Sequence, residues 1–365
     1  MAVSHRKLAQ ATHSNRSDVP LDAVNLYSDI VSSSLAENTR IAYEKGWTCF
    51  KEYCVTRNLH PLSATPEDIA DFMIKLATRP RPRPSNKTIS GRVLSMGTVV
   101  LYRSAINRKY VESGVVSPTN HPTVNAVLKG LARLRGTPAR QVKALREYHI
   151  RKMLNICDRM IKQPSKRLIG LRDAAIIAIG FAGALRRSEI CGLTMEDIEL
   201  VESNSRLLRK SQSNREQYSA SSSSTKMFVY VRRSKTDQEG KGHKVAILGG
   251  KYLKPVQRLL DWLEASGITN GPVFQTMKRG GTLRGRPLHH SDVPRLVKHY
   301  ARLVGLDSKD VSGHSLRAGF VTSAACHNAR LDKIMEITRH TNPSTVMKYI
   351  RDADSFTDHA GESFL

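Results

Sequence analysis

The chain has 365 residues, enough for two domains with ordinary hydrophobic cores. Its 58 lysines and arginines against 32 acidic residues give a formal charge of +26, so we expect a polyanionic partner, nucleic acid in preference to a membrane. No apolar run approaches the roughly 18 residues that span a bilayer. The first twenty residues lack a signal peptide's apolar block, so we expect a cytoplasmic protein. The five scattered cysteines indicate reduced thiols, with neither a disulfide frame nor a zinc site.

Helical periodicity dominates the N-terminal third. After a tail over residues 1–20 that we expect to be disordered, the sequence predicts an all-helical domain over residues 21–136. Its first helix opens at a capping box, Ser34-Leu-Ala-Glu37, and continues to about Cys54. The other predicted helices cover residues 65–77, 95–113 and 122–135, with proline or a capping residue at their starts and glycine after the last two.

A basic segment over residues 137–147 predicts an extended linker to a second, mixed α+β domain over residues 148–351. Residues 173–182 are apolar nearly all round and predict a central buried helix. Residues 227–231 and 243–248 predict two strands of a small antiparallel sheet, preceded by a serine-rich surface loop over residues 203–224. The remaining predicted helices cover residues 147–160, 253–265, 292–304, 316–325, 331–338 and 344–350.

Several residues of the second domain suit cleavage of a phosphodiester. That reaction needs a nucleophile, cationic donors on the phosphate oxygens and a proton source for the leaving oxygen. Arg186 and Arg317 can supply bidentate donors, Lys235 can protonate the leaving 5′-oxygen, and Tyr349 can attack. His314 precedes Arg317 by three residues, so on a helix their side chains share a face. Each residue alone is more often structural, and only the joint order favours a site.

That order resembles the tyrosine recombinase (phage integrase) family, and its Cre-like members in particular. The matching stretches are Ala184-Leu-Arg-Arg-Ser-Glu189, Arg233-Ser-Lys235-Thr, Ser312-Gly-His-Ser-Leu-Arg-Ala-Gly319, Arg339-His340 and Val346-Met-Lys-Tyr-Ile-Arg351. The resemblance implies that Arg186 and Arg317 clamp the phosphate, Lys235 is the general acid, His314 aids proton transfer, His340 bonds the scissile phosphate, Tyr349 is the nucleophile and Glu189 supports the site from behind. Two departures are Arg339, where many relatives have glycine, and the serine-rich segment, which looks like an insertion.

The resemblance also implies how DNA is held. Family members resemble a C-shaped clamp, with the helical core-binding domain on one face of the duplex and the catalytic domain on the other. The implied DNA-binding residues are Arg40 and Lys45 in the first helix, Arg103, Asn107 and Arg108 in the third, Arg140 and Lys143 in the linker, and His290, Ser291 and Arg295 on the catalytic side. No metal or other cofactor is implied, because positive side chains take the roles that a metal ion could play.

We therefore expect a site-specific recombinase that cuts and rejoins double-stranded DNA through a 3′-phosphotyrosyl intermediate and a Holliday junction. Its expected partner is DNA with inverted-repeat sites, bound by a homotetramer at the nucleoid, with no small-molecule substrate. An acidic segment over residues 352–365, with Phe356, Phe364 and Leu365 as apolar anchors, is expected to dock on a neighbouring protomer. The alternatives are a type IB topoisomerase and a catalytically silent DNA-binding protein. A metal-dependent nuclease is disfavoured, since no carboxylate cluster with ligand spacing is present.

Overall fold

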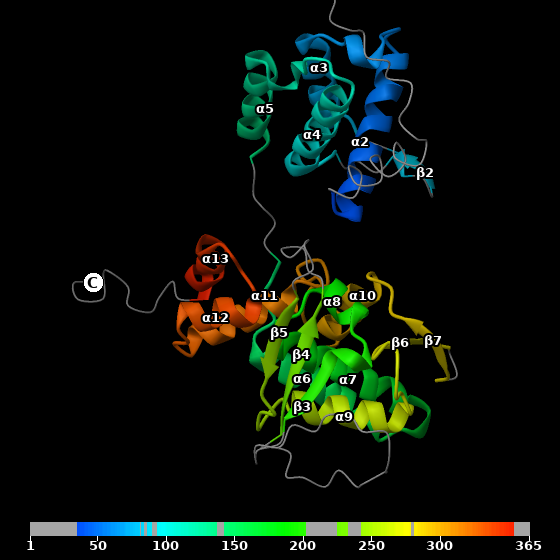
Figure 1. Cartoon of the computed structure of the whole chain (residues 1–365), viewed down its shortest axis with the longest axis vertical. Helices are drawn as coiled ribbons and strands as arrows, with labels where there is room; N and C mark the ends of the chain where they lie inside the picture. The colour runs from blue at the N-terminus through cyan, green and yellow to red at the C-terminus, as the bar shows by residue number, and fades with distance from the viewer. Residues whose placement is uncertain are drawn as a thin grey trace, which may run out of the picture. The chain divides into compact units, whose positions relative to one another are not determined.

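A computed structural model describes residues 35–80, 82–83, 86–89, 93–136, 142–201, 225–232, 242–278 and 281–353. The chain folds as two compact units that divide between residues 139 and 140 (Figure 1). The predicted tail over residues 1–20, the serine-rich loop over residues 203–224 and residues 354–365 of the predicted docking segment lie outside the described residues.

The first unit is a small helical bundle. Its helices are α2 (Glu37–Val55), α3 (Pro66–Thr78), α4 (Met96–Glu112) and α5 (Pro122–Arg135), with short 3-10 turns at Pro61–Ser63 and Pro118–Asn120. α2 packs against α4 and α3 packs against α5. Apolar side chains from all four helices form one core, in which Phe50, Met73 and Ile106 are fully buried. The four predicted helices of this unit are therefore confirmed.

Two local features of this unit differ from the sequence prediction. The capping box at Ser34-Leu-Ala-Glu37 is wrong, because α2 begins at Glu37 with Ala36 as an N-cap that makes no side-chain bond. A capping box does start α3, where Thr65 Oγ1 accepts from the Asp68 N–H (3.2 Å) and Asp68 accepts from the Thr65 N–H (3.0 Å). A short antiparallel ribbon, β1 (Pro82–Arg83) and β2 (Asn86–Ile89), interrupts the helices. Strands this short are not predicted from the sequence, because they show no clear alternation of apolar and polar residues.

The second unit surrounds one buried helix. Its helices are α6 (Glu147–Ile161), α7 (Arg167–Ala182), α8 (Arg187–Gly192), α9 (Pro255–Ser266), α10 (Asp292–Leu303), α11 (Ser315–Cys326), α12 (Leu331–Thr338) and α13 (Pro343–Ala353). α7 packs against both α6 and α9 and is buried along most of its length, as its apolar composition predicts (Figure 1). No helix among the described residues is long and apolar enough to cross a membrane.

A three-stranded antiparallel sheet in the order β3-β4-β5 covers this core. The strands are β3 (Ile198–Val201), β4 (Lys226–Val231) and β5 (His243–Ile247), and the buried Val229 of β4 pairs with the buried Val245 of β5. A second ribbon joins β6 (Gln275–Met277) to β7 (Leu283–Pro287). The sequence predicted β4 and β5 but missed β3 and this ribbon. All three missed strands have five residues or fewer.

The chain enters the second unit along the first turn of α11. The Lys143 N–H donates to the Asp310 carbonyl (2.7 Å), the Leu145 N–H donates to the Ser315 carbonyl (3.1 Å), and Leu145 is fully buried. A Cβ on Gly319 would lie 2.0 Å from the Leu145 carbonyl oxygen, so only glycine allows this crossing. The second half of the expected linker is therefore held tightly, through backbone bonds that composition does not reveal.

Candidate active site

Arg317 lies at the centre of a cluster of buried charges. It is the third residue of α11 and is 5% exposed. Its guanidinium donates to the Ala184 carbonyl (2.9 Å) and to the Thr338 carbonyl, which belong to the α7–α8 turn and to the end of α12. These two acceptors fix the guanidinium between three elements, so its direction is set by the fold.

Glu189 joins two further arginines. Its carboxylate accepts from the Arg186 N–H (2.7 Å) and from Arg186 Nη1 (2.8 Å) at the start of α8. Arg339, which lies 150 residues later in the sequence, donates from Nη2 to Glu189 Oε2 (2.7 Å). The Glu189 side chain is 1% exposed, so these bonds replace the water that a buried carboxylate would otherwise need.

Arg339 ends α12 in the left-handed conformation, with φ 56° and ψ 42°. Besides Glu189, its guanidinium donates to the Ile337 carbonyl (3.0 Å). Sequence reasoning noted Arg339 only as a departure from the glycine of many relatives and missed this contact. The sequence signal for this contact was a charged residue in place of a glycine, directly before His340.

The cluster carries more positive than negative charge. Three guanidiniums, those of Arg186, Arg317 and Arg339, face the single carboxylate of Glu189. Burial, together with the neighbouring Arg186 and Arg339, lowers the pKa of Arg317 to about 9. An anion placed beside Arg317 would relieve this repulsion, and a DNA phosphate is such an anion.

His340 follows the cluster directly. Its Nδ1 lies 2.9 Å from Thr338 Oγ1, which itself lies 2.6 Å from the Ile334 carbonyl oxygen. Because the threonine proton goes to that carbonyl, Nδ1 is the donor in the first bond, and Nε2 of the neutral ring is an acceptor. Burial, followed by repulsion from Arg317, lowers the pKa of His340 to about 4. The ring is therefore neutral at pH 7 until an anion compensates the arginines.

Tyr349 and His314 reach the cluster from two different helices. Tyr349 lies on α13, which packs against α11 and α12, and is half-buried beside Val321, Ile334 and Val346. Its phenol is within electrostatic range of Arg317. His314 is the N-cap residue of α11 and is exposed, whereas Arg317 one turn later is buried. The structure thus brings Arg186, Glu189, Arg317 and His340 together, with Tyr349 beside them.

Lys235 lies outside the described residues. The strands that flank it in the sequence are well defined, with Val231 of β4 paired to His243 of β5. Arg232, the residue after β4, is anchored by Asp197 and Glu196. Among the described residues, no group of three or more His, Cys, Asp or Glu side chains is placed to hold a metal ion.

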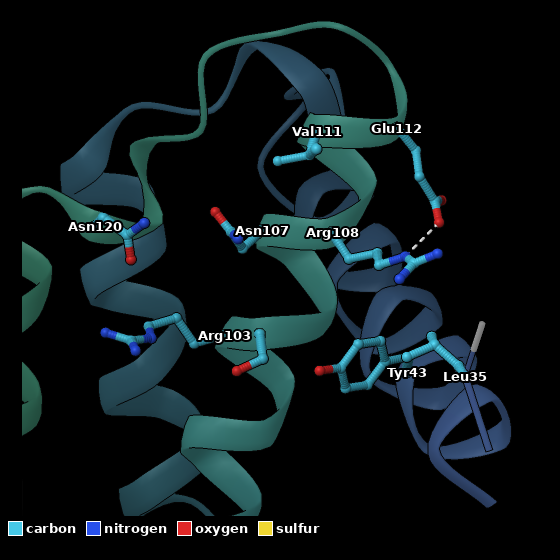
Figure 2. Close-up of a pocket in the computed structure, with 9 residues that line it drawn as sticks. Leu35, Tyr43, Arg103, Asn107, Arg108, Val111, Glu112 and Asn120 are labelled. Carbon is cyan, nitrogen blue, oxygen red and sulfur yellow. Dashed lines mark hydrogen bonds and ion pairs between the residues drawn. The ribbon is translucent and has the colours of Figure 1, made fainter. Parts of the chain in front are cut away.

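Three of the five DNA-binding candidates of the first unit line one cavity of about 530 Å³ between α2 and α4. Figure 2 shows Tyr43 of α2 together with Arg103, Asn107 and Arg108 of α4 at its wall. Arg103 donates to the Asn125 side chain (2.9 Å), Asn107 accepts from the Thr119 hydroxyl (3.0 Å) and Arg108 donates to Glu112 (2.7 Å). These polar side chains are ordered by neighbours at the protein surface.

The other candidates are scattered over the surface. Arg40 and Lys45 are exposed on α2, where Arg40 forms an ion pair with Glu37 (2.8 Å). In the second unit, Lys143 and His290 are exposed, and Ser291 and Arg295 lie at the start of α10, bonded to each other (3.1 Å). Arg140 lies outside the described residues.

Comparison with known proteins identifies the family. The Phage integrase family matches residues 143–355, which include every residue of the cluster. The integrase/recombinase XerD homolog of Selenomonas ruminantium is 30% identical over 335 residues, spanning 90% of this chain and 86% of that protein. The chain belongs to the phage integrase family. The recombinase Cre of Escherichia phage P1 is 24% identical over 371 residues. That match covers 94% of this chain and 95% of Cre.

A solved phage integrase structure has the same fold. The lambda integrase dimer, residues 75–356 bound to a COC′ core site, superposes with a TM-score of 0.52 at 16% identity, covering 90% of this chain and 94% of that one. The predicted membership of the family, the tyrosine recombinase activity and the mainly helical fold with small antiparallel sheets are confirmed. These phage integrase relatives do not favour a topoisomerase or a silent DNA-binding protein.

Proposed function

We propose that this recombinase exchanges strands between two DNA sites through a covalent bond to Tyr349. The buried cluster of Arg186, Arg317, Arg339 and Glu189 is the observation that carries the proposal. Its excess positive charge is held in one geometry beside a half-buried phenol, which is what attack on a phosphate requires. An arginine cluster without an adjacent nucleophile would support binding alone.

In the proposed cleavage step, the Tyr349 oxygen attacks the phosphorus and the bond from phosphorus to the 5′-oxygen breaks. Arg186 and Arg317 hold the non-bridging oxygens, on which negative charge builds up. His314 takes part in moving the phenolic proton, and Lys235 gives a proton to the departing 5′-oxygen. The products are a 3′-phosphotyrosyl ester and a free 5′-hydroxyl.

His340 completes the phosphate contacts in this proposal. Since Nε2 of its neutral ring is an acceptor, it must gain a proton before it donates to a phosphate oxygen. The arriving phosphate favours that proton because its negative charge offsets the neighbouring arginines. The reaction then runs in reverse with the 5′-hydroxyl of the second site as the nucleophile, so the ester stores the bond energy and no external energy source is needed.

DNA is the proposed partner of both units. The cavity wall of Arg103, Asn107 and Arg108 and the exposed Arg40 and Lys45 suit a duplex held by the first unit, the core-binding domain. In the second unit, the proposed catalytic domain, the start of α10 offers Ser291 and Arg295. The relatives include a lambda integrase dimer bound to a core site. For this chain we propose a homotetramer on inverted-repeat sites at the nucleoid, with the segment over residues 352–365 docking on a neighbouring protomer.

A strand-transfer assay tests the proposal. A bound sequence is first selected from random duplexes, and two duplexes of unequal length carrying it are then mixed with the protein in EDTA. We expect products of hybrid length together with a covalent protein–DNA adduct. Relaxation of plasmids that lack the selected sequence, without hybrid products, would instead indicate a topoisomerase. Binding without any adduct would indicate a silent DNA-binding protein.

A further inference from the structure

Arg339 occupies a backbone conformation that costs free energy for any residue except glycine. Its φ of 56° lies in the left-handed region, where a Cβ crowds the backbone. A residue other than glycine persists there when the surrounding structure holds it in place. The contacts of its side chain must therefore offset this cost.

Those contacts connect three parts of the active site. Nη2 donates to Glu189 Oε2 on α8 (2.7 Å), and Nη1 donates to the Ile337 carbonyl on α12 (3.0 Å) and, at 3.4 Å, to the Gly183 carbonyl in the α7–α8 turn. The side chain is 3% exposed. Arg339 thus ties the end of α12 to the segment that carries Arg186.

Glu189 is shared between the two arginines. One carboxylate oxygen accepts from Arg186 Nη1, and the other accepts from both the Arg186 N–H and Arg339. The orientation of the Arg186 guanidinium therefore depends on a carboxylate that Arg339 holds from the other side. Arg317 adds a third positive charge within range of Glu189. With one arginine fewer, the buried carboxylate would lose a fixed partner and its orientation.

Arg339 is poorly placed to bind phosphate itself. Nη1 already donates to two carbonyls and Nη2 to Glu189 and the Ala184 carbonyl, whereas each terminal nitrogen of Arg317 donates to one carbonyl. Only Nε of Arg339, which is buried, has no acceptor in the described part of the chain. Arg186 is more accessible, with its side chain 11% exposed. Any effect of Arg339 on a reacting phosphate therefore passes through its neighbours.

We infer that Arg339 is a positioning residue, which fixes Glu189 and through it the phosphate-binding geometry of Arg186. This inference rests on the proposed function, since it assigns Arg339 to the cleavage step. Glycine at position 339 would adopt the same backbone conformation without strain but would leave Glu189 with Arg186 as its ion-pair partner among the described residues.

The test measures cleavage and binding separately on a nicked duplex that traps the covalent adduct. We expect Arg339→Gly and Arg339→Gln to cleave roughly 10- to 100-fold more slowly at saturating protein, because the phosphate is bound in a looser geometry. The Kd for the same duplex should change less than about twofold, since the Arg339 side chain is 3% exposed and bonded within the protein. Arg330→Ala is the matched control. It removes an arginine–Asp332 pair just before the same helix, with the arginine side chain 79% exposed, and should cleave at the wild-type rate.

A double variant shows whether Arg339 acts through Glu189. In a Glu189→Gln background, adding Arg339→Gly should slow cleavage little further, since effects that pass through one contact are not additive. Fully multiplicative losses would overturn the inference. So would a wild-type cleavage rate in both Arg339 variants while the wild-type protein forms adduct. If Arg339→Gly does not fold, Arg339→Gln, which keeps most of the volume, decides. Absence of adduct from the wild-type protein would instead contradict the proposed function.

Discussion

The two units use arginine in opposite ways. In the second unit, Arg317 and Arg339 are buried and bonded to backbone carbonyls or to Glu189. In the first unit, Arg40 and Arg108 lie at the surface and pair with acidic residues one helical turn away. A buried guanidinium has one orientation, which suits chemistry at a fixed phosphate. An exposed one can leave its carboxylate for a DNA phosphate at little cost.

The energies of the two kinds of contact explain the difference. An exposed ion pair contributes about 0–1 kcal/mol, so exchanging Glu37 or Glu112 for a phosphate changes little. Removing one partner of a buried pair costs about 3–5 kcal/mol, because the other charge is left without compensation. We therefore expect substitutions in the second unit to change cleavage and stability, and substitutions in the first unit to change affinity.

Loss of Arg317 should give the largest effect. Arg317→Ala removes a proposed donor to the phosphate, and we expect the cleavage rate of bound DNA to fall about 100- to 1000-fold. The dissociation constant should change only a few-fold, because the other proposed DNA-binding residues remain. Single-turnover cleavage and a gel shift on the same duplex measure both. If affinity falls by the same factor as the cleavage rate, Arg317 contributes to DNA binding alone. Arginines of the two units would then have the same role.

Substitution of Gly319 should have the second-largest effect, on the free energy of unfolding. Gly319→Ala places a Cβ 2.0 Å from the Leu145 carbonyl oxygen, so the entering chain must move away from α11. We expect the free energy of unfolding to fall by about 3 kcal/mol, as in severe overpacking. Gly192→Ala in the same unit is the control, since its Cβ would meet no atom within 4 Å. Thermal denaturation compares them, and an equal Tm for the two variants would contradict the close crossing.

Substitution of Arg103 should give the smallest effect, on affinity alone. Arg103→Ala should weaken DNA binding by about tenfold or less, and the slope of log K against log salt should become shallower by about 0.9 if Arg103 contacts one phosphate. An unchanged slope with relaxed sequence preference would indicate a base contact instead. Cleavage of DNA already bound should keep the wild-type rate. A slower rate at saturating protein would show that the first unit also shapes the reaction.

The sequence predicted the long elements and the order of the catalytic candidates. Periodicity identified the helices that became α3, α4 and α10, and the apolar run identified α7 as buried. Arg186, Glu189, Arg317 and His340 could be proposed together because the spacing of their motifs matched a known family. Their convergence on Ala184, Thr338 and Glu189 could not be predicted from periodicity, since those bonds cross up to 150 residues of sequence.

The remaining misses have local physical causes. The carbonyl contacts of Arg339 depend on a left-handed backbone that arginine rarely adopts, so its burial left no pattern in the sequence. Gly319 belongs to one of the matching motifs, but glycine is required there because the backbone at Leu145, far away along the chain, passes close to it. The strand β3 and the β6–β7 ribbon are too short to alternate visibly. Tertiary contacts of single residues determine these features, so no repeating pattern in the sequence reveals them.

The central claim is that Tyr349 becomes covalently bound to DNA, and peptide mapping of the adduct tests it directly. The wild-type protein is incubated with a nicked duplex carrying its selected site, digested with protease and nuclease, and analysed by mass spectrometry. We expect a nucleotide mass on the peptide containing Tyr349, and none from Tyr349→Phe, which should still bind the duplex. A nucleotide on any other residue, or an adduct formed by Tyr349→Phe, would contradict it.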